Sequence, residues 1–352
     1  MSLQALDELG NPVDWAFAYK VPLLSGGAQN DPATGYEYAY SDSNNPKPSK
    51  SAHRLDQESG AIHETLAQLK NSGVSYLLYN DEMPDSVGKP DNDGLGHTKG
   101  IIAWDVASKT GFWLVHSWPK FPDLDATAAP TPIYGQTFLC LSLNLDALEQ
   151  IAGQMLCHQE PQVYKSYLAG APPINLHSLA LGNLTPHPHP AFDALPLKTL
   201  GGMDFTVLAK NREWQGDFWN GSNGEGVGPA LGVDLNVETW IRGPIAPTLD
   251  ADGLHRVTDI KFINMGPLGM HWNFSETSDH SKYGLSVDPS KPLFVCGDIN
   301  RMLSQRKRGG GAVAFANLDL WAALSKIDLV MAAPGMTREQ THAHLKTTHS
   351  KA

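Results

Sequence analysis

The chain has 352 residues, of which 41% are hydrophobic and 9% aromatic, so it has ample material for a packed core and does not have the composition of a disordered chain. Its formal net charge of −11 at pH 7 disfavours a polyanionic ligand at neutral pH, although protonation of all 14 histidines would change that charge to +3. No apolar run approaches the ~20 residues that cross a bilayer, so we expect no membrane partner.

Two features bear on the cellular compartment. The N-terminus lacks a basic region followed by an apolar stretch, so no signal peptide is visible and the localisation stays unknown. The three cysteines, Cys140, Cys157 and Cys296, are odd in number and do not describe a disulfide framework. Because Cys140 and Cys296 lie in apolar, strand-like runs, we expect both to be buried thiols.

Apolar runs and helical spacings alternate along the first part of the chain. The strands expected from apolar runs cover residues 14–20, 97–105 and 111–117. The helices expected from apolar residues at intervals of three and four cover residues 60–69 and 145–156. Two polar stretches rich in Gly, Pro, Asn and Asp are expected to form surface loops, at residues 25–50 and 82–96. This alternation predicts an α/β fold, with a sheet covered by helices.

The sequence changes character at residues 185–190, where proline alternates with histidine. Alternating prolines favour an extended linker over a His-x-His metal site, so we expect no metal here. We place a boundary at this point, between a first half at residues 1–185 and a second half at residues 186–352. Beyond it, apolar runs predict strands at residues 204–210, 280–288 and 293–298.

The two halves repeat each other in three places. Residues 14–20 and 204–210 are apolar runs that begin with Asp and end with Lys. His97 and His280 are each followed by Lys at the second position and Asp at the eighth. Each of these motifs is followed in turn by another apolar strand. Three matches in the same order predict a duplicated α/β unit.

The repeated motif supplies four candidate catalytic residues: His97, Lys99, His280 and Lys282. Because side chains alternate along a strand, each histidine is expected to project from the same face as its lysine. Phosphodiester cleavage needs a nucleophile, stabilised equatorial oxygens and a proton for the leaving oxygen. Two facing pairs would supply all three without a divalent metal: one imidazole attacks phosphorus, two ammonium groups hold the oxygens, and the second imidazole protonates the leaving group.

A basic, glycine-rich stretch follows the last of these strands. It contains the densest cluster of cations in an acidic chain, ahead of three glycines: Arg301, Arg306, Lys307 and Arg308. Such a loop is suited to contact with the phosphate backbone of DNA. The alternative is a solvated run of charges without a partner.

Three polar residues at strand ends are supporting candidates. Asp298 and Asn300 follow the strand at residues 293–298, where Asn300 could donate to a phosphate oxygen or orient His280. Ser117 ends the corresponding strand of the first half. Three aromatic residues near the motifs could stack on bases, but core packing is the favoured interpretation for Trp118, Phe121 and Trp272.

These stretches closely resemble the deoxyribonuclease II family. The resemblance rests on Gly-His-Thr-Lys-Gly at residues 96–100, the strand and Trp-Pro at residues 111–119, Asp-His-Ser-Lys at residues 279–282 and Gly-Asp-Ile-Asn at residues 297–300. It runs from about residue 13 to residue 321. The fold that it implies is an α/β, phospholipase D-like fold with two pseudosymmetric halves, in which central mixed β-sheets are flanked by helices.

The resemblance also implies an activity. This is metal-independent endonucleolytic hydrolysis of double-stranded DNA, best in acid and without a cofactor, through a phosphohistidine that leaves 3′-phosphate and 5′-hydroxyl ends. His97, Lys99, His280 and Lys282 map onto the two catalytic pairs of the family, and we favour His97 as nucleophile and His280 as general acid. Asp298 stands where phospholipase D-type enzymes usually carry Ser, which leaves its role open.

Several alternatives stay open at this stage. The chain could be a phospholipase D-type phosphodiesterase with a substrate other than DNA, or a DNA-binding protein whose catalytic pairs are inactive. A homodimer could clamp duplex DNA. Animal members of the family are lysosomal or secreted and disulfide-bonded, so the missing signal peptide and unpaired cysteines fit a bacterial or otherwise non-lysosomal origin.

Overall fold

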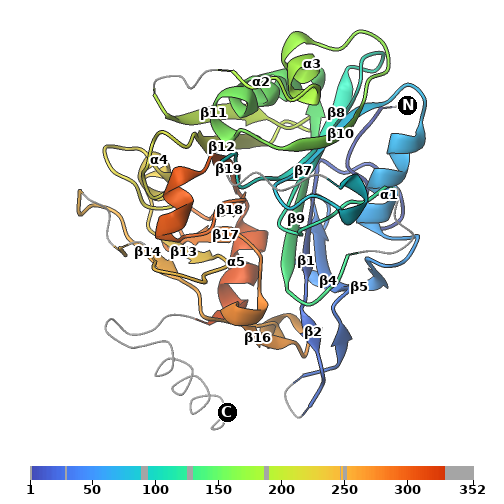
Figure 1. Ribbon diagram of the computed structural model, residues 1–352. Coiled ribbons are helices and arrows are strands. Elements are labelled where there is room, and N and C mark those ends of the chain that lie inside the picture. The colour runs from blue at the N-terminus through green and yellow to red at the C-terminus, as the bar shows by residue number, and fades with distance from the viewer. Residues whose placement is uncertain are drawn as a thin grey trace.

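The fold is described from a computed structural model, which covers residues 2–27, 30–88, 94–124, 130–185, 190–245, 247–248 and 252–329. Two large β-sheets lie side by side, the first in blue to green and the second in yellow to red (Figure 1). No helix among the described residues is long and apolar enough to cross a membrane.

The first sheet has eight strands in the spatial order β10-β6-β7-β8-β9-β1-β4-β5. Their bounds in chain order are β1 Trp15–Lys20, β4 Glu37–Asp42, β5 Ser49–Arg54, β6 Ser75–Asn80, β7 Lys99–Asp105, β8 Thr110–His116, β9 Gln136–Asn144 and β10 Val163–Tyr167. Its neighbouring strands pair antiparallel. A small hairpin, β2 Leu23–Leu24 with β3 Ala33–Thr34, lies outside this sheet.

The second sheet has seven strands in the order β11-β12-β19-β18-β17-β13-β14. Their bounds are β11 Phe192–Lys198, β12 Asp204–Lys210, β13 Leu235–Glu238, β14 Val257–Asp259, β17 Tyr283–Ser286, β18 Leu293–Gly297 and β19 Gly310–Ala316. The pair β13–β14 is parallel, so the second sheet is mixed, whereas the first is antiparallel throughout. A three-stranded sheet is formed by β15 Phe262–Asn264, β16 Asn273–Ser275 and β20 Asp328–Leu329.

Five strands of each sheet follow the same order. The series β6-β7-β8-β9-β1 in the first sheet corresponds to β13-β17-β18-β19-β12 in the second, and every pairing within both series is antiparallel. In both series the strand at one end comes first in the chain and the other four follow in sequence order. Corresponding strand ends therefore carry corresponding residues of the two His-x-Lys motifs.

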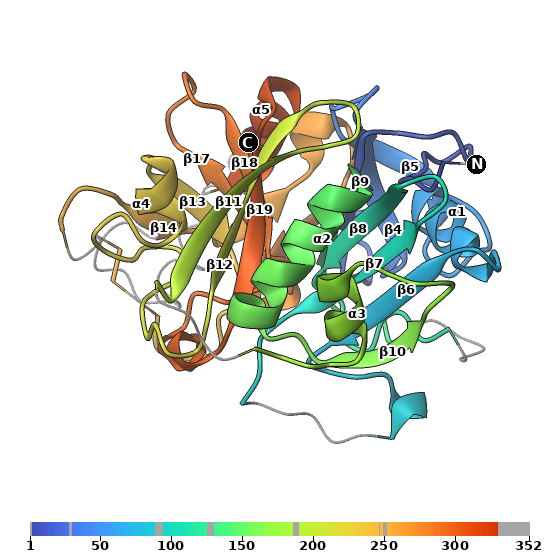
Figure 2. The same cartoon turned by 90° about the horizontal axis from the view of Figure 1, so that it is seen from above.

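Within the described part of the chain, five α-helices accompany the sheets: α1 Ala61–Ala67, α2 Leu145–Gln154, α3 Ile174–Ala180, α4 Val227–Leu231 and α5 Leu318–Ile327. The helices expected at residues 60–69 and 145–156 are thus confirmed. Helix α2 begins at Asn144, whose side chain accepts a hydrogen bond from the backbone of Ala147 at 2.8 Å, a typical N-cap. In Figure 2 this helix lies between the β11–β12 hairpin and strand β8, and it contacts both sheets.

One hydrophobic core joins the two sheets. Phe17 of β1 packs edge-to-face on Phe294 of β18, with ring centroids 5.0 Å apart, and Trp15 meets Phe315 at 5.5 Å. All four side chains are at most 3% exposed. The core between the sheets is therefore shared, while each half also buries a smaller apolar cluster of its own.

Two sequence-based expectations need comment. The surface loop expected at residues 25–50 is wrong in part, because it contains β4, in which Tyr38, Ala39 and Tyr40 are buried and supply the apolar contacts that the polar composition hides. The proline- and histidine-rich linker falls mainly on residues 186–189, which lie outside those described. Cys140 and Cys296 are buried as expected, and all three cysteines are free.

Candidate active site

The two His-x-Lys motifs lie at similar places, at or just before the start of a strand. His97 lies two residues before β7 begins at Lys99, and His280 lies three residues before β17 begins at Tyr283. The backbone N–H of His97 donates to the carbonyl of Gly309 at 2.9 Å, and that of His280 donates to the carbonyl of Gly135 at 2.8 Å. Each motif is therefore held by the opposite half of the chain.

The two imidazole rings are oriented by a second pair of exchanged contacts. Nδ1 of His97 lies 2.6 Å from the carbonyl of Asp298, which directly follows β18. Nδ1 of His280 lies 2.9 Å from the carbonyl of Ser117, which directly follows β8, and 3.3 Å from Oε1 of Gln136. A carbonyl oxygen only accepts hydrogen bonds, so each Nδ1 carries a proton. In the neutral ring the lone pair is then on Nε2, which is the atom left to react.

A buried ion cluster surrounds His97. Asp81, at the end of β6, pairs with the ammonium of Lys99, lies 3.1 Å from Nη1 of Arg308, and places Oδ2 3.9 Å from Nε2 of His97. Burial alone would raise the pKa of Asp81, but Lys99, His97 and Arg308 together hold that pKa well below its ordinary value. The carboxylate therefore stays charged in acid and can stabilise positive charge on His97.

Burial lowers the pKa of His97 well below its ordinary value; Asp81 opposes this shift, whereas Lys99 and Arg308 add to it. Only 6% of the residue is exposed. The neutral form of His97, with a lone pair on Nε2, is thus favoured in the free protein.

The surroundings of His280 differ in charge. The ammonium of Lys282 lies 3.2 Å from Nδ1 of His280 and donates to its carbonyl at 2.6 Å. Burial, Lys282, Lys99 and His97, in that order, lower the pKa of His280 well below its ordinary value. Burial and the charge of Lys99 lower the pKa of Lys282 to about 7. The protonated forms of His280 and Lys282 are therefore more populated in acid than at neutral pH.

Charges of one motif act on residues of the other. Lys282 lowers the pKa of His97, and both Lys99 and His97 lower that of His280. The backbone N–H of Lys99 also donates to the carboxyl group of Asp298. The four predicted catalytic residues thus belong to one electrostatic cluster at the meeting point of the two sheets.

The supporting residues are buried in the same region. Ser117 donates to Oε1 of Gln136 at 2.6 Å and accepts from the backbone of Thr137 at 3.0 Å, so its hydroxyl is structural while its carbonyl orients His280. Burial raises the pKa of Asp298 well above its ordinary value, which favours a neutral carboxyl group. Among the described residues, the side-chain oxygen of the buried Asn300 has no hydrogen-bond partner; a role toward a phosphate remains a prediction.

The basic cluster divides into buried and exposed residues. Arg301 is 1% exposed and is paired with Asp259 at 2.7 Å, so the prediction that it contacts DNA is corrected: its charge holds a loop inside the protein. Arg308 points into the ion cluster through Asp81 and donates to the carbonyls of Leu95 and Gly96. Lys307 is exposed and Arg306 half-buried.

Sequence reasoning missed three residues around the imidazoles: Asp81 and Trp240, which lie beside the rings, and Tyr134, which packs on Trp240. The ring of Trp240 lies 5.1 Å from that of His280, and Tyr134 packs on Trp240 at 4.5 Å. Asp81 and Trp240 each come just after a buried strand, which is the one signal that could have indicated them. The aromatic residues considered from sequence are instead in the core: Trp118, Phe121 and Trp272 are at most 9% exposed.

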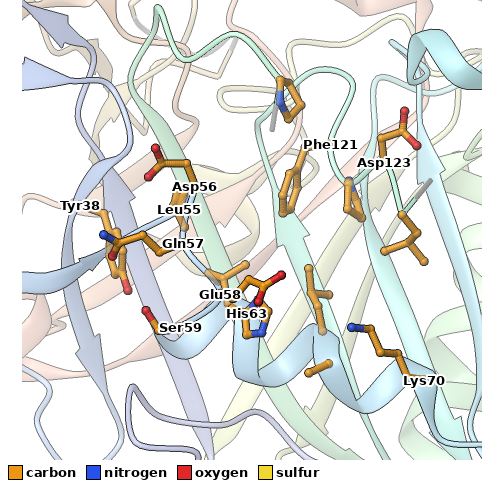
Figure 3. Close-up of a pocket in the computed structure, with 16 residues that line it drawn as sticks. Tyr38, Leu55, Asp56, Gln57, Glu58, Ser59, His63, Lys70, Phe121 and Asp123 are labelled. Atoms are coloured by element: carbon orange, nitrogen blue, oxygen red, sulfur yellow. The ribbon is translucent and has the colours of Figure 1, made fainter. Parts of the chain in front are cut away.

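A separate hollow of about 380 Å³ lies beside α1 (Figure 3). Its apolar floor includes Leu55, Leu66 and Phe121, and Asp56, Glu58 and Asp123 are among the residues that line it. None of the four catalytic candidates lines it. The three carboxylates outnumber Lys70 in this lining, which disfavours binding of a phosphate backbone.

Comparison with known proteins identifies the family. The family model of deoxyribonuclease II matches residues 4–332. A putative deoxyribonuclease-2 of Burkholderia pseudomallei is 46% identical, with complete coverage of both chains. The chain belongs to the deoxyribonuclease II family. It is accordingly a hydrolase, a nuclease of the deoxyribonuclease II type.

More distant deoxyribonuclease II relatives match over similar lengths. Deoxyribonuclease-2-alpha of Rattus norvegicus is 33% identical over 93% of both chains, and deoxyribonuclease-2 of Caenorhabditis elegans is 33% identical over 91% of both. The crystal structure of yeast tyrosyl-DNA phosphodiesterase aligns with 63% of this chain and 67% of its own, at 10% identity and a TM-score of 0.31. That likeness is too weak to carry an argument.

Among the described residues, no three His, Cys, Asp or Glu side chains gather in a group that could hold a metal ion. The cations at the site come from the chain itself: Lys99, Lys282 and Arg308. The deoxyribonuclease II chain thus brings two oriented imidazoles and three cations into one cluster.

Proposed function

We propose that the chain is an endonuclease that hydrolyses DNA phosphodiester bonds in acid, with two histidines and without a metal ion. The observation that carries the proposal is the exchange of contacts at the rings: each Nδ1 donates to a carbonyl of the opposite half, so that each Nε2 is left to react. We further propose that the halves at residues 1–185 and 186–352 are pseudosymmetric units of a phospholipase D-like fold. The shared strand order and the exchanged contacts support this fold.

His97 is the nucleophile in this proposal. Its Nε2 attacks phosphorus, the P–N bond forms, and the bond from phosphorus to the 5′ oxygen breaks. Formation of the phosphohistidine leaves a positive charge on the imidazole, because Nδ1 keeps its proton. Asp81, 3.9 Å from Nε2, is placed to stabilise that charge, and among the described residues no carboxylate forms an ion pair with His280.

His280 is the general acid. Its protonated Nε2 gives a proton to the leaving 5′ oxygen, and the neutral ring then takes a proton from water that attacks phosphorus. The P–N bond breaks, His97 is restored, and the products carry a 3′-phosphate and a 5′-hydroxyl group. Because burial and nearby cations lower the pKa of His280, the protonated form requires acid. This is the physical reason for an acid optimum.

The cations of the chain stabilise the phosphate oxygens. Lys99 and Lys282 lie beside the two rings, and each is at most 2% exposed, so their charges act with little screening by water. The pKa of Lys282, about 7, means that its charge is also lost as the pH rises above neutrality. Both lysines and both histidines come from one chain, so this chemistry does not require the homodimer that the sequence allows.

Contacts with the DNA backbone are proposed for the exposed Lys307 and the half-buried Arg306 of the basic loop. Arg308 is proposed as a cation of the reacting centre, because it already contacts Asp81. A negative charge of −11 at neutral pH opposes a polyanion, and histidine protonation reduces that opposition in acid. Binding and chemistry are thus favoured by the same change in pH.

Plasmid nicking tests the proposal. Wild type, His97→Ala and His280→Ala are compared at pH 5 and pH 7.5 in excess EDTA. We expect cleavage by wild type at pH 5 and a loss of at least ~10³-fold in either variant, since each removes a reacting group. Full activity in either variant refutes the two-histidine mechanism, and abolition by EDTA indicates a metal nuclease. Cleavage of phosphatidylcholine but not plasmid would indicate a phosphodiesterase with another substrate, and cleavage of neither substrate an inactive binding protein.

A further inference from the structure

The surroundings of the two rings differ at matching positions. Gly100, just after Lys99, pairs with Tyr79, and Tyr283, just after Lys282, pairs with Glu238. Two residues beyond these partners lie Asp81 in the first half and Trp240 in the second. The carboxylate beside His97 is therefore replaced by an indole ring beside His280.

The same replacement recurs one strand pair away. Val115 pairs with Leu139 in the first half, and Cys296 pairs with Val313 in the second. Five residues before Leu139 lies Tyr134, and five residues before Val313 lies Arg308. Arg308 pairs with Asp81 at 3.1 Å, whereas Tyr134 packs on Trp240 at 4.5 Å. An ion pair on one side corresponds to an aromatic pair on the other.

The aromatic pair is open to solvent and carries a cation. The guanidinium of Arg242 lies 3.7 Å from the ring centre of Trp240, and it donates to the carbonyl of Thr277 at 2.7 Å. Arg242 is exposed, Tyr134 is 37% exposed, and Trp240 is half-buried. The ring of Tyr134 stands at 66° to that of Trp240, so the guanidinium plane over Trp240 and the ring of Tyr134 are the surfaces on which a base can stack. This partly exposed, cationic cluster differs from the core aromatics Trp118 and Trp272, which are each 1% exposed.

We infer that Trp240, Tyr134 and Arg242 form a nucleotide subsite, which takes the base of the nucleotide that leaves with the 5′ oxygen. The inference rests on the proposed function, because it places this nucleotide on the side of the general acid His280. Bases stack on aromatic rings and on guanidinium planes without regard to sequence. The charge of Arg242 is also available to the next phosphate. On the opposite side, the described residues beside His97 are the ions Asp81 and Arg308, and no aromatic ring among them packs on that imidazole.

An oligonucleotide with one abasic position tests the subsite. Two end-labelled single strands of about a dozen nucleotides are compared; they are identical except that one carries a stable tetrahydrofuran abasic nucleotide in the middle. Cleavage on the 5′ side of that nucleotide releases it as the leaving group, and cleavage on its 3′ side does not. Wild type should cut the 5′-side bond roughly 5- to 100-fold more slowly than in the intact strand, given typical stacking contributions. The 3′-side bond should change little.

Trp240→Ala should remove this discrimination, so that the 5′-side bond is cut equally in both strands. Arg242→Lys, which keeps the charge but loses the plane and does not touch His280, should weaken it. Thermal melts check that both variants fold, and Trp240→Phe should retain discrimination. The inference is overturned if wild type treats the strands alike, if the 3′-side bond is the one affected, or if Trp240→Ala still discriminates. A failure of the proposed function gives a different result from a failure of the subsite. If the two-histidine mechanism is wrong, His97→Ala still cuts the intact strand.

Discussion

His97 and His280 make equivalent backbone contacts, but the charged groups beside the two rings differ. A carboxylate lies 3.9 Å from Nε2 of His97, whereas an ammonium lies 3.2 Å from Nδ1 of His280. Carboxylates favour the imidazolium form and ammonium groups oppose it. In the proposed mechanism, the carboxylate stabilises the cationic phosphohistidine that forms at His97, and the ammonium makes protonated His280 a stronger acid.

Replacement of Lys282 by Met should shift the pH dependence. A general acid must be protonated, and Lys282 lowers the pKa of His280, so its removal raises that pKa. The fall of kcat/KM on the alkaline side should then occur at higher pH, while the maximum falls roughly 10²- to 10³-fold because a phosphate ligand is lost. Lys326→Met, which removes an exposed charge of α5 outside the proposed site, is the control. An unchanged alkaline limb in Lys282→Met would assign the titration to another group.

At the scale of elements, two lysines fix the loops that complete the site. Lys20 ends β1 and donates to the carbonyls of Pro132 and Tyr134, ahead of β9. Lys210 ends β12 and donates to the carbonyls of Arg306 and Arg308 at 2.9 and 2.5 Å, ahead of β19. The matching runs that end in these lysines thus hold the segments that present Tyr134 and Arg308.

Lys210→Met should impair both stability and catalysis. Two carbonyls would lose a buried donor, at a cost of about 1–3 kcal/mol each in the free energy of unfolding. Arg308 would also lose its support, so plasmid cleavage per folded molecule should fall. Lys198→Met is the matched control, because that lysine is exposed and pairs with the exposed Asp204. If the two variants behave equally in urea unfolding and in plasmid nicking, Lys210 does not hold the segment that presents Arg308.

At the scale of the molecule, the shared core makes the two sheets one folding unit. Phe294 is fully buried and packs on Phe17 of the other sheet. Phe294→Ala should lower the free energy of unfolding by about 3–5 kcal/mol. Tryptophan fluorescence and far-UV circular dichroism should report a single transition, as in wild type. Leu318→Ala, at a side chain that is 60% exposed, should change little. Two separate transitions would show that the halves fold independently.

The charge of the whole molecule bears on DNA binding. In an inactive His97→Ala background at pH 5, Arg306→Ala and Lys307→Ala should weaken binding. Each should reduce the slope of log K against log salt by about 1 if it neutralises a phosphate. Lys326→Ala, at an exposed residue of α5, provides the control. A slope that is the same in all variants would remove the loop from the interface.

The sequence by itself determined the repeat, the helices α1 and α2, the strands of the two motifs and the four catalytic candidates. These features follow from local patterns, because the apolar spacing and the His-x-Lys interval each lie within a short stretch of sequence. Strand β4 was not predicted, because its tyrosines are buried by neighbours distant in sequence.

Tertiary structure alone decided which neighbours each imidazole has. Asp81 lies 16 residues from His97 in sequence and Trp240 lies 40 from His280, and strand pairing brings both to the rings. Burial likewise decided that Arg301 pairs with Asp259 inside the protein while Lys307 meets solvent. Charge, tautomer and access depend on contacts between segments far apart in the chain, and local sequence patterns do not encode those contacts.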